Sequence, residues 1–329
     1  MSDENKGSVL VTGGAGYIGS HVALALLARG ERVVVLDDLS ESDESRILPG
    51  IEFVRGHTGD SALVEKVINE QGVGSVLHFA GFIRVDESVR EPDKYFKNNT
   101  ENTGILAAAC VKAGVKHFIF SSSAAVYGNP ERVPAHEDDR LLPINPYGES
   151  KLRAEKILLE LEGMQKGILR YFNVAGVDPE VRTGYRIEKS PTHMIRSCIR
   201  AHLENRKFTI FGSDYPTKDG TCVRDYIHVT DLAAAHVKVL DYLRGSGVTR
   251  IFNCGNGIGS SNLEVVQAVG RVAGKELDYS FGPRREGDPA ELVADSSRIK
   301  SELGWQPKLG LEDMIQHELQ WVKRQEEKK

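Results

Sequence analysis

Short apolar runs alternate with longer stretches of helical periodicity over the first half of the chain. The apolar runs predict β-strands at 8–12, 32–36, 51–54, 75–79, 117–121 and 167–172. Between them, apolar residues recur every three or four positions, which predicts helices at 18–29, 61–71, 92–113 and 146–162. Such alternation is typical of βαβ units, so we expect an α/β fold, a Rossmann-type doubly wound parallel sheet with helices on both faces.

The pattern changes after residue 174. Turn-forming and charged residues dominate 178–227, with one predicted helix at 192–204, and a strand pattern returns at 250–253. We therefore expect a first domain at 1–174, to which the chain returns around 225–255. The remaining residues, mainly 175–329, should form a smaller C-terminal domain.

A glycine-rich turn follows the first predicted strand, with the spacing G-x-x-G-x-x-G at Gly13, Gly16 and Gly19. Gly13 permits a tight turn, Gly16 lets the backbone approach a pyrophosphate, and Gly19 lets helix and strand pack closely. The second strand is followed by Asp37, whose carboxylate suits a ribose 2′-hydroxyl and repels a 2′-phosphate. The sequence therefore predicts a dinucleotide site that takes NAD in preference to NADP.

Tyr147 and Lys151 lie four residues apart on a predicted helix, and thus on one of its faces. Free tyrosine has a pKa of about 10, so its base form is scarce near pH 7, and a neighbouring ammonium group favours the phenolate. The pair alone is also common on surface helices. Beside a nicotinamide cofactor it predicts proton transfer coupled to hydride transfer.

Composition narrows the class of partner. The chain has 329 residues, 40% of them hydrophobic, and a net charge of -5, which argues against nucleic acid or an anionic membrane as partner. We expect a cytoplasmic protein, because the start at 1–7 is polar and no apolar run is long enough to span a membrane. No metal-ligand set is visible, and four cysteines are scattered without metal spacing: Cys110, Cys198, Cys222 and Cys254.

Arginines cluster at two places in the second half of the chain. Arg224 begins a short apolar element, and Arg284 and Arg285 lie in a glycine-bounded loop. Planar guanidinium groups pair well with phosphates, so we expect a diphosphate substrate there. Three histidines beside apolar runs are interpreted as structural: His78, His117 and His228.

With these motifs the chain resembles the extended short-chain dehydrogenase/reductase family, and within it the branch of UDP-glucose 4-epimerases. The similarity spans nearly the whole chain and is carried by the stretches 11–21, 78–81, 120–128, 146–151, 169–173, 211–217 and 219–229. It implies an isomerase of galactose and carbohydrate metabolism that interconverts UDP-glucose and UDP-galactose. Transient oxidation by NAD at C4 would give a 4-keto sugar, which rotates and takes the hydride back on its other face.

The resemblance also implies residue roles. Tyr147 would take the proton from the sugar 4-hydroxyl, Ser123 would hydrogen-bond near that oxygen, and Lys151 would bind the nicotinamide ribose and lower the pKa of Tyr147. The implied NAD-binding residues in the first domain are Gly13, Gly16, Tyr17, Ile18, Gly19, Asp37, Phe79, Ala80, Gly81, Asn98, Tyr147, Lys151 and Tyr171. The implied substrate-binding residues are Ser123, Asn173, Phe211, Arg224, Arg285, Asp288 and Leu292. Members are homodimers, so we expect helices 92–113 and 146–162 to pair with their copies.

Four positions depart from the family pattern: His57, Ile83, Asn102 and Leu292. Leu292 stands where a large Tyr limits the sugar pocket in many members, so a UDP-N-acetylglucosamine 4-epimerase, or another UDP-sugar-modifying member, is the alternative. A 4,6-dehydratase is disfavoured because Ala124 and Ala125 follow Ser123 where that enzyme carries acids. A catalytically silent NAD sensor is disfavoured because Tyr147 and Lys151 are both kept.

Overall fold

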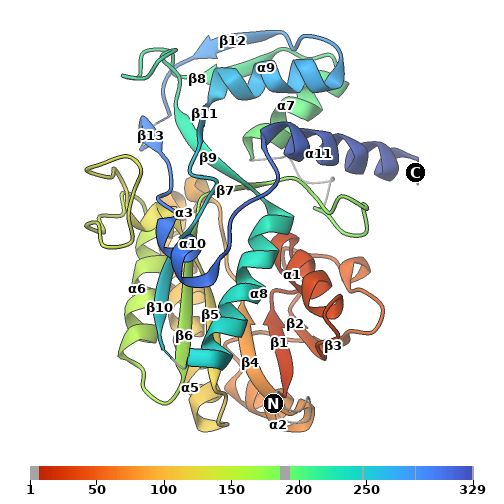
Figure 1. The fold of residues 1–329 in the computed structure, drawn as a ribbon, viewed down its shortest axis with the longest axis vertical. Helices are drawn as coiled ribbons and strands as arrows, with labels where there is room; N and C mark the ends of the chain where they lie inside the picture. Colours follow the sequence, from red (N-terminus) through yellow and green to blue (C-terminus); the bar gives the residue numbers. More distant parts are fainter. Residues whose placement is uncertain (1–6, 186–192, 247, 286, 328–329) are drawn as a thin grey trace. The chain divides into compact units, whose positions relative to one another are not determined.

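The computed structural model describes residues 7–185, 193–246, 248–285 and 287–327 (Figure 1). The chain divides into two compact units. The first unit contains Met1–Val126, Leu141–Arg170 and Ala233–Phe252, and the second contains Tyr127–Arg140, Tyr171–Leu232 and Asn253–Lys329. Each unit is described below by itself.

The first unit is built on a seven-stranded sheet with the order β10-β6-β5-β4-β1-β2-β3. Its strands are β1 (Ser8–Thr12), β2 (Val33–Asp37), β3 (Glu52–Arg55), β4 (Val73–His78), β5 (His117–Ser123), β6 (Gln165–Tyr171) and β10 (Arg250–Cys254). From β3 to β5 the neighbouring strands run parallel. The predicted doubly wound α/β fold is thus confirmed, and its strand order reverses between β1 and β4, where such folds bind ligands.

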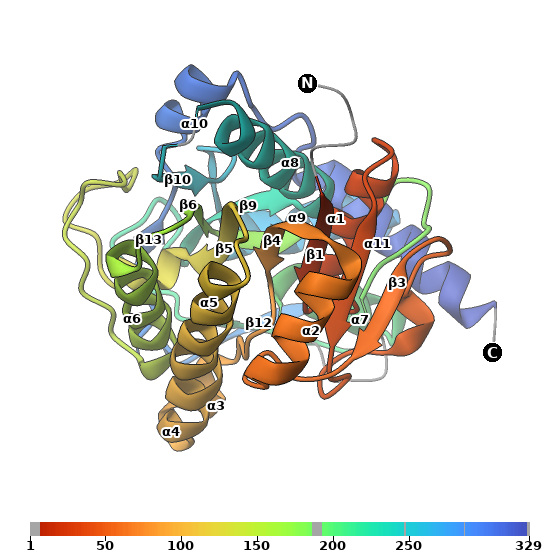
Figure 2. The ribbon, with the colours of Figure 1, turned by 90° about the horizontal axis from the view of Figure 1, so that it is seen from below.

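Helices cover both faces of this sheet. Three of them, α2 (Ser61–Gln71), α5 (Asn102–Lys112) and α6 (Pro146–Glu160), lie side by side on one face, where their apolar residues share a core with the strands (Figure 2). On the other face lie α1 (Tyr17–Leu27) and α8 (Val229–Ser246). There α8 packs closely on β6, because a Cβ on Gly167 would come within 2.4 Å of Val239.

The long helix predicted at 92–113 is interrupted. It consists of α4 (Pro92–Tyr95), a π-helical segment η3 (Phe96–Glu101) and α5, and it follows a short helix that the pattern did not indicate, α3 (Val85–Arg90). The side chain of Asn99 bonds outside the helix, to the backbone of Phe82, which accounts for the altered winding at this point. Two short 3₁₀ segments complete the unit, η2 (Glu44–Arg46) and η4 (Ala124–Val126).

The second unit combines short strands with four helices in the described residues. The strands are β7 (Asn173–Ala175), β8 (Phe208–Phe211), β9 (Val223–His228), β11 (Gly259–Ser261), β12 (Tyr279–Gly282) and β13 (Glu291–Leu292). The helices are α7 (Met194–Leu203), α9 (Asn262–Ala273), α10 (Ser297–Leu303) and α11 (Leu311–Glu326). Helices α7, α9 and α11 bury a common apolar core against β9. The helix predicted at 192–204 begins at Met194, and Thr192 lies outside the described residues.

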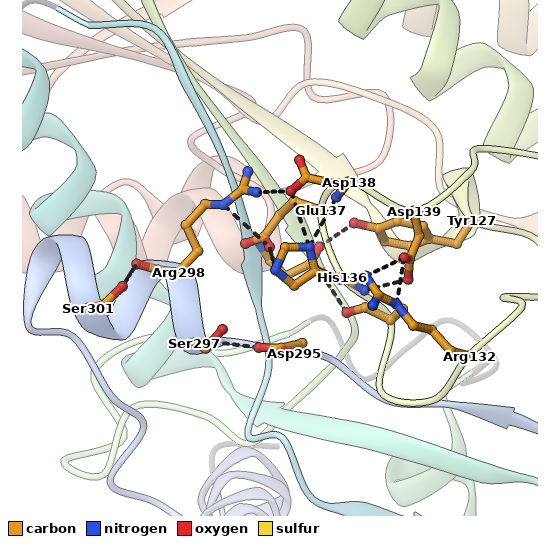
Figure 3. A network of polar contacts seen from close by, with 12 residues as sticks. Tyr127, Arg132, His136, Glu137, Asp138, Asp139, Asp295, Ser297, Arg298 and Ser301 are labelled. Carbon is orange, nitrogen blue, oxygen red and sulfur yellow. Dashed lines mark hydrogen bonds and ion pairs between the residues drawn. The ribbon is translucent and has the colours of Figure 1, made fainter.

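One segment before residue 174 belongs to the second unit, which differs from the predicted boundary. Tyr127–Arg140 is held there by polar contacts (Figure 3). The Tyr127 hydroxyl donates to Asn253 Oδ1 at 2.6 Å, and the backbone N–H of Asn253 donates to Glu137 Oε1 at 2.8 Å. Arg298 on α10 completes the network through Asp138, at 2.7 Å. These partners are distant in sequence, so no local pattern could indicate them.

Candidate active site

Helix α6 carries Tyr147 and Lys151 in its first turns. The helix begins there because Asn145 caps it, accepting a hydrogen bond from the Gly148 N–H at 2.9 Å, and because Pro146 occupies the first helical position. This start places Tyr147 one turn before Lys151 on the same face, as the four-residue spacing predicted.

Ser123, the last residue of β5, meets Tyr147. Its hydroxyl hydrogen-bonds the phenol, which lowers the pKa of Tyr147, but burial is the larger effect and leaves that pKa raised above its usual value. The ring of Tyr147 also packs edge-on against Tyr95, with 6.4 Å between ring centroids. The structure therefore brings together two of the three residues to which the sequence analysis assigned chemistry, and presents Tyr147 as a neutral phenol.

Lys151, the third of these residues, is buried. Its Nζ donates to the Ser121 carbonyl at 3.0 Å and lies 5.0 Å from the centre of the Phe120 ring. Burial lowers the pKa of Lys151 to about 8, and the charge of Glu155 opposes that shift. The causes that act on the Tyr147 pKa in the structure are burial and Ser123, so the expected lowering of that pKa by Lys151 stays a prediction.

His78 lies beneath the site at the end of β4. Its Nδ1 is 2.6 Å from Thr12 Oγ1, and its Nε2 is 2.8 Å from Thr103 Oγ1. Burial lowers the pKa of His78 to about 3, with a further contribution from Lys151. A neutral imidazole that links two threonine hydroxyls from different elements ties β1 to α5, which fits the structural interpretation of this residue.

The glycine turn forms the floor of a pocket in the first unit. Gly13 has a φ of 69°, and a Cβ there would lie 2.5 Å from the backbone nitrogen of Ala80, so only glycine fits. A Cβ on Gly19 would lie 2.3 Å from the Gly13 carbonyl oxygen, which lets α1 approach β1 closely. Gly16 is the N-cap of α1, and Tyr17 and Ile18 are its first two residues, so the positive end of the helix dipole at this turn suits a phosphate.

Asp37 closes one side of the pocket. One carboxylate oxygen accepts from the Ala15 N–H at 3.0 Å, and the other accepts from Ser42 Oγ at 2.7 Å and from the Leu39 N–H at 2.9 Å. The residue is thereby fixed between the glycine turn and the loop after β2. This position at a strand end next to the glycines is the one expected for a ribose contact.

The pocket lining joins residues that the sequence analysis selected with others that it did not. Selected residues in the lining are Gly13, Gly16, Asp37, Phe79, Ala80, Gly81 and Asn98. Additional residues are Leu36, Asp38, Ser40, Glu41, Ser42, Gly56, His57, Thr58 and Phe82. A tight glycine cradle at a helix start and an acid at the next strand end, both within this lining, fit a dinucleotide.

Asn99 is a residue of this region that the sequence analysis missed. Its Oδ1 accepts from the Phe82 N–H at 2.9 Å, and its Nδ2 donates to the Phe82 carbonyl at 2.9 Å and to Ser150 Oγ at 3.2 Å. It thus clamps the loop after β4, which lines the pocket, to α6, which carries Tyr147 and Lys151. The only sequence signal was a run of poor helix formers, 98–100, inside a predicted helix.

In the second unit, strand pairing gathers three of the selected residues. Leu292 on β13 pairs in parallel register with Arg224 on β9, and Asn173 on β7 pairs with Tyr226. Paired residues point to the same face, as do positions two apart on one strand. Asn173, Arg224 and Leu292 therefore lie on one face of this small sheet.

Arg224 is fixed by backbone carbonyls. Its Nη1 donates to the carbonyls of Val223 and Pro289 at 2.9 and 2.8 Å, and its Nη2 lies 3.4 Å from Asp288 Oδ1. In the same unit Arg285 stacks on Phe211, with 4.3 Å from the guanidinium carbon to the ring centre. A planar cation over an aromatic ring and a second, oriented guanidinium are groups that recognise bases and phosphates.

The neighbour of Arg224 has a different task. Asp225 is fully buried and accepts hydrogen bonds from the N–H groups of Asn256, Gly257 and Ala294, at 2.8 to 3.1 Å. Burial raises the pKa of Asp225 to about 6 against these hydrogen bonds. Within one short motif, then, Arg224 is oriented by backbone carbonyls while Asp225 holds the surrounding loops.

Neither a metal centre nor a membrane span is found in the part of the chain that the structure describes. No group of three or more His, Cys, Asp or Glu side chains there could hold a metal ion. Among those same residues, no helix is both long and apolar enough to cross a membrane. The four cysteines are buried and unpaired.

Residues 9–255 match the model of the NAD dependent epimerase/dehydratase family. The chain belongs to this family. It is 47% identical to a UDP-glucose 4-epimerase of Azospirillum brasilense, over 99% of this chain and 96% of that protein.

Solved structures of the family agree with the fold of this member. A UDP-glucose-4-epimerase from Stenotrophomonas maltophila, with bound NAD and formylated UDP-arabinopyranose, superposes with a TM-score of 0.95 at 36% identity, covering 98% of this chain and all of that one (100%). A UDP-glucose 4-epimerase from Bifidobacterium longum, in complex with NAD+ and UDP, has a TM-score of 0.90 at 38% identity, with 96% and 98% of the two chains covered.

Three departures from the family pattern lie in the first unit. His57 lines the pocket, and its Nδ1 accepts from the Gly59 N–H at 3.0 Å. Asn102 is buried beside the same loop, with its Oδ1 2.5 Å from where a Cβ on Gly59 would lie. Ile83 is 56% exposed. The first two therefore shape the loop that borders the pocket, whereas the third is a surface position.

Proposed function

We propose that this protein is an NAD-dependent epimerase that interconverts UDP-glucose and UDP-galactose. The observation that carries the proposal is the contact of Ser123 with Tyr147, with Lys151 one helical turn further along α6, in the unit that also holds the dinucleotide pocket. Relatives named UDP-glucose 4-epimerase over nearly the full length support this choice among the reactions of the family.

NAD is proposed to bind in the pocket of the first unit. The residues that would hold it are the glycine turn, Asp37 and the loop Phe79–Phe82, with Tyr17 and Ile18 as further contacts. NAD bound there would supply the hydride chemistry at C4 of the sugar and a positive charge on its oxidised ring. Because each cycle restores the oxidant, the cofactor has no need to leave.

Proton transfer is assigned to Tyr147. The phenol is neutral in the structure, so its conversion to the base requires positive charge nearby. The Lys151 ammonium supplies one such charge, and Ser123 orients the phenol oxygen. Tyr147 then takes the 4-hydroxyl proton and later gives it back, as a general base and acid.

The second unit is proposed to hold the UDP portion of the substrate. The residues that would hold UDP are Asn173, Phe211, Arg224, Arg285 and Asp288, and Leu292 would lie nearer the sugar. Binding energy taken from UDP leaves the sugar itself free to turn over between the two hydride transfers. In this proposal the UDP portion supplies the binding energy, and the sugar portion undergoes the reaction.

The direct test is to incubate the purified protein with UDP-galactose and identify the sugar nucleotide formed by chromatography and NMR. We expect UDP-glucose, with no added oxidant consumed, and release of NAD on denaturation. Tyr147→Phe should retain bound NAD and lose turnover by ~10²-fold or more. A 4-keto-6-deoxy product, or no change of the sugar, would contradict the proposal.

Assembly and location complete the proposal. We infer a homodimer formed through α5 and α6, supported by Leu159 on α6, which is apolar and 44% exposed. Light scattering at micromolar concentration should give twice the mass of 36.2 kDa. A cytoplasmic place in galactose metabolism is supported by the four unpaired cysteines, which fit a reducing compartment.

A further inference from the structure

A charged pair lies in the interior of the first unit, one helical turn beyond Lys151. On β6, Arg170 donates from Nε to Glu155 Oε1 at 3.0 Å and from Nη2 to Oε2 at 2.6 Å. The two side chains are 2% and 1% exposed. Burying an ion pair costs the desolvation of both charges, so its contribution to stability is a weak reason for its presence.

A serine hydroxyl links this pair to β5. Ser122 Oγ donates to Glu155 Oε1, and Ser122 is buried. Its two chain neighbours both touch the site, since the Ser121 carbonyl accepts from Lys151 and the Ser123 hydroxyl bonds Tyr147. The Glu155 carboxylate therefore anchors the strand at the one residue that lies between these two contacts.

Glu155 also acts on Lys151 through its charge. It is the carboxylate that opposes the lowering of the Lys151 pKa by burial. The other groups near the ammonium carry no negative charge at neutral pH. They are His78 from β4, whose pKa is about 3, Asn99 from η3 and Tyr147 one turn earlier on α6. The partner of Glu155, Arg170 from β6, is cationic.

We propose that Glu155 is a positioning residue for the reaction: it holds β5 through Ser122 and places its carboxylate one helical turn from Lys151. Arg170 orients the carboxylate for both tasks. One buried group thereby sets the place of Ser123 and the Ser121 carbonyl, and the electrostatic potential at the ammonium. The inference rests on the proposed function, and it assigns a reason to an ion pair that lies outside the lining of the dinucleotide pocket.

The electrostatic part is tested with Glu155→Gln. We expect the pKa of Lys151 to fall by roughly 1 unit, the scale for one nearby charge, so that activity at alkaline pH is lost about 1 unit earlier. The titration is measured by NMR of lysine labelled with ¹³C at Cε, and the Lys151 signal is assigned by its loss in Lys151→Met. An unchanged Lys151 titration in folded Glu155→Gln overturns the proposal.

The positional part is tested with Ser122→Ala, which keeps every charge. We expect kcat to fall about tenfold, because small misplacements of reacting groups are costly, with unchanged KM for the UDP-sugar and unchanged NAD content. Ser75→Ala is the matched control: Ser75 is an equally buried strand serine, 3.2 Å from His117, and its loss should leave kcat unaltered. Equal kcat in the two variants overturns the proposal.

Failure of this proposal can be distinguished from failure of the proposed function. The NMR titration needs no turnover, so it reports the effect of Glu155 on Lys151 even if the wild-type protein leaves UDP-galactose unchanged. Removing one partner of a buried pair can also prevent folding. If Glu155→Gln does not fold, the comparison of Ser122→Ala with Ser75→Ala decides.

Discussion

Replacing Lys151 by alanine should reduce turnover in a manner that depends on pH. Lys151 stands one helical turn from Tyr147, and an opposite charge at such a range shifts a pKa by about 1–3 units. Its ammonium is also bound to the Ser121 carbonyl and loses its proton near pH 8, so we expect the lower half of that range. The deficit at pH 7 should therefore be roughly 10–100-fold, since one pK unit is a factor of ten.

The assay is the conversion of UDP-galactose to UDP-glucose, coupled to oxidation of the product and followed from pH 6 to 10. Wild-type activity should rise as Tyr147 loses its proton and decline above about pH 8 as Lys151 loses its own. Lys151→Ala should lack that decline, and its deficit should narrow at high pH. Lys151→Arg, which keeps a permanent charge, should also lack the decline while retaining more activity at pH 7.

Two outcomes would refute this reasoning. A decline near pH 8 that persists in Lys151→Ala would belong to another group. A deficit of the same size at every pH would mean that Lys151 acts by holding the cofactor and contributes no charge to the phenol.

Three further results are expected. Gly13→Ala should remove bound NAD and destabilise the protein, because its Cβ would meet the Ala80 backbone at 2.5 Å; Gly30→Ala, at a similar φ but with open space, is the control, and equal NAD loss in both would contradict the account. Leu292→Tyr should suppress a weak activity on UDP-N-acetylglucosamine and spare UDP-glucose, changing the ratio by roughly 10–200-fold; an unchanged ratio would mean that position 292 does not limit the sugar pocket. Burial raises the pKa of Glu318 to about 7, so the folded state holds a proton that the unfolded state releases above about pH 4.5. This contribution to stability, at most about 3 kcal/mol, is present below that pH and lost as the pH rises through 7, so denaturant titrations should show a flatter pH dependence for Glu318→Gln, and parallel curves would refute it.

The first unit could be predicted from the sequence because its signals are local. The strand Ser8–Thr12, the glycine turn and the helix that follows adjoin one another, and α2 begins and ends at the predicted residues, 61 and 71. The start of α6, which positions Tyr147 and Lys151, is likewise specified by the neighbouring residues Asn145 and Pro146. Local chemistry specified these elements, and tertiary packing did not override it.

Much of the second unit could not be predicted, since its elements are too short to show a period. Strand β13 has two residues and β7 three, and both exist because they pair with β9 across long stretches of chain. Because Leu292 and Arg224 are also far apart in sequence, their pairing could not be predicted. The link from Ser122 to Glu155 and Arg170 was hidden for a different reason, because a serine in a strand and a glutamate in a helix carry no signal that they meet.

The path of the chain between the two units has a consequence for biosynthesis. The strand β10 at the sheet edge and most of α8 come from Ala233–Phe252, after the chain has built part of the second unit. A nascent chain halted before residue 233 would expose the face of β6 that Val239 and Leu243 cover at Gly167. The dinucleotide-binding unit should therefore complete its fold only after some three quarters of the protein has left the ribosome, and a fragment ending near residue 174 should be insoluble.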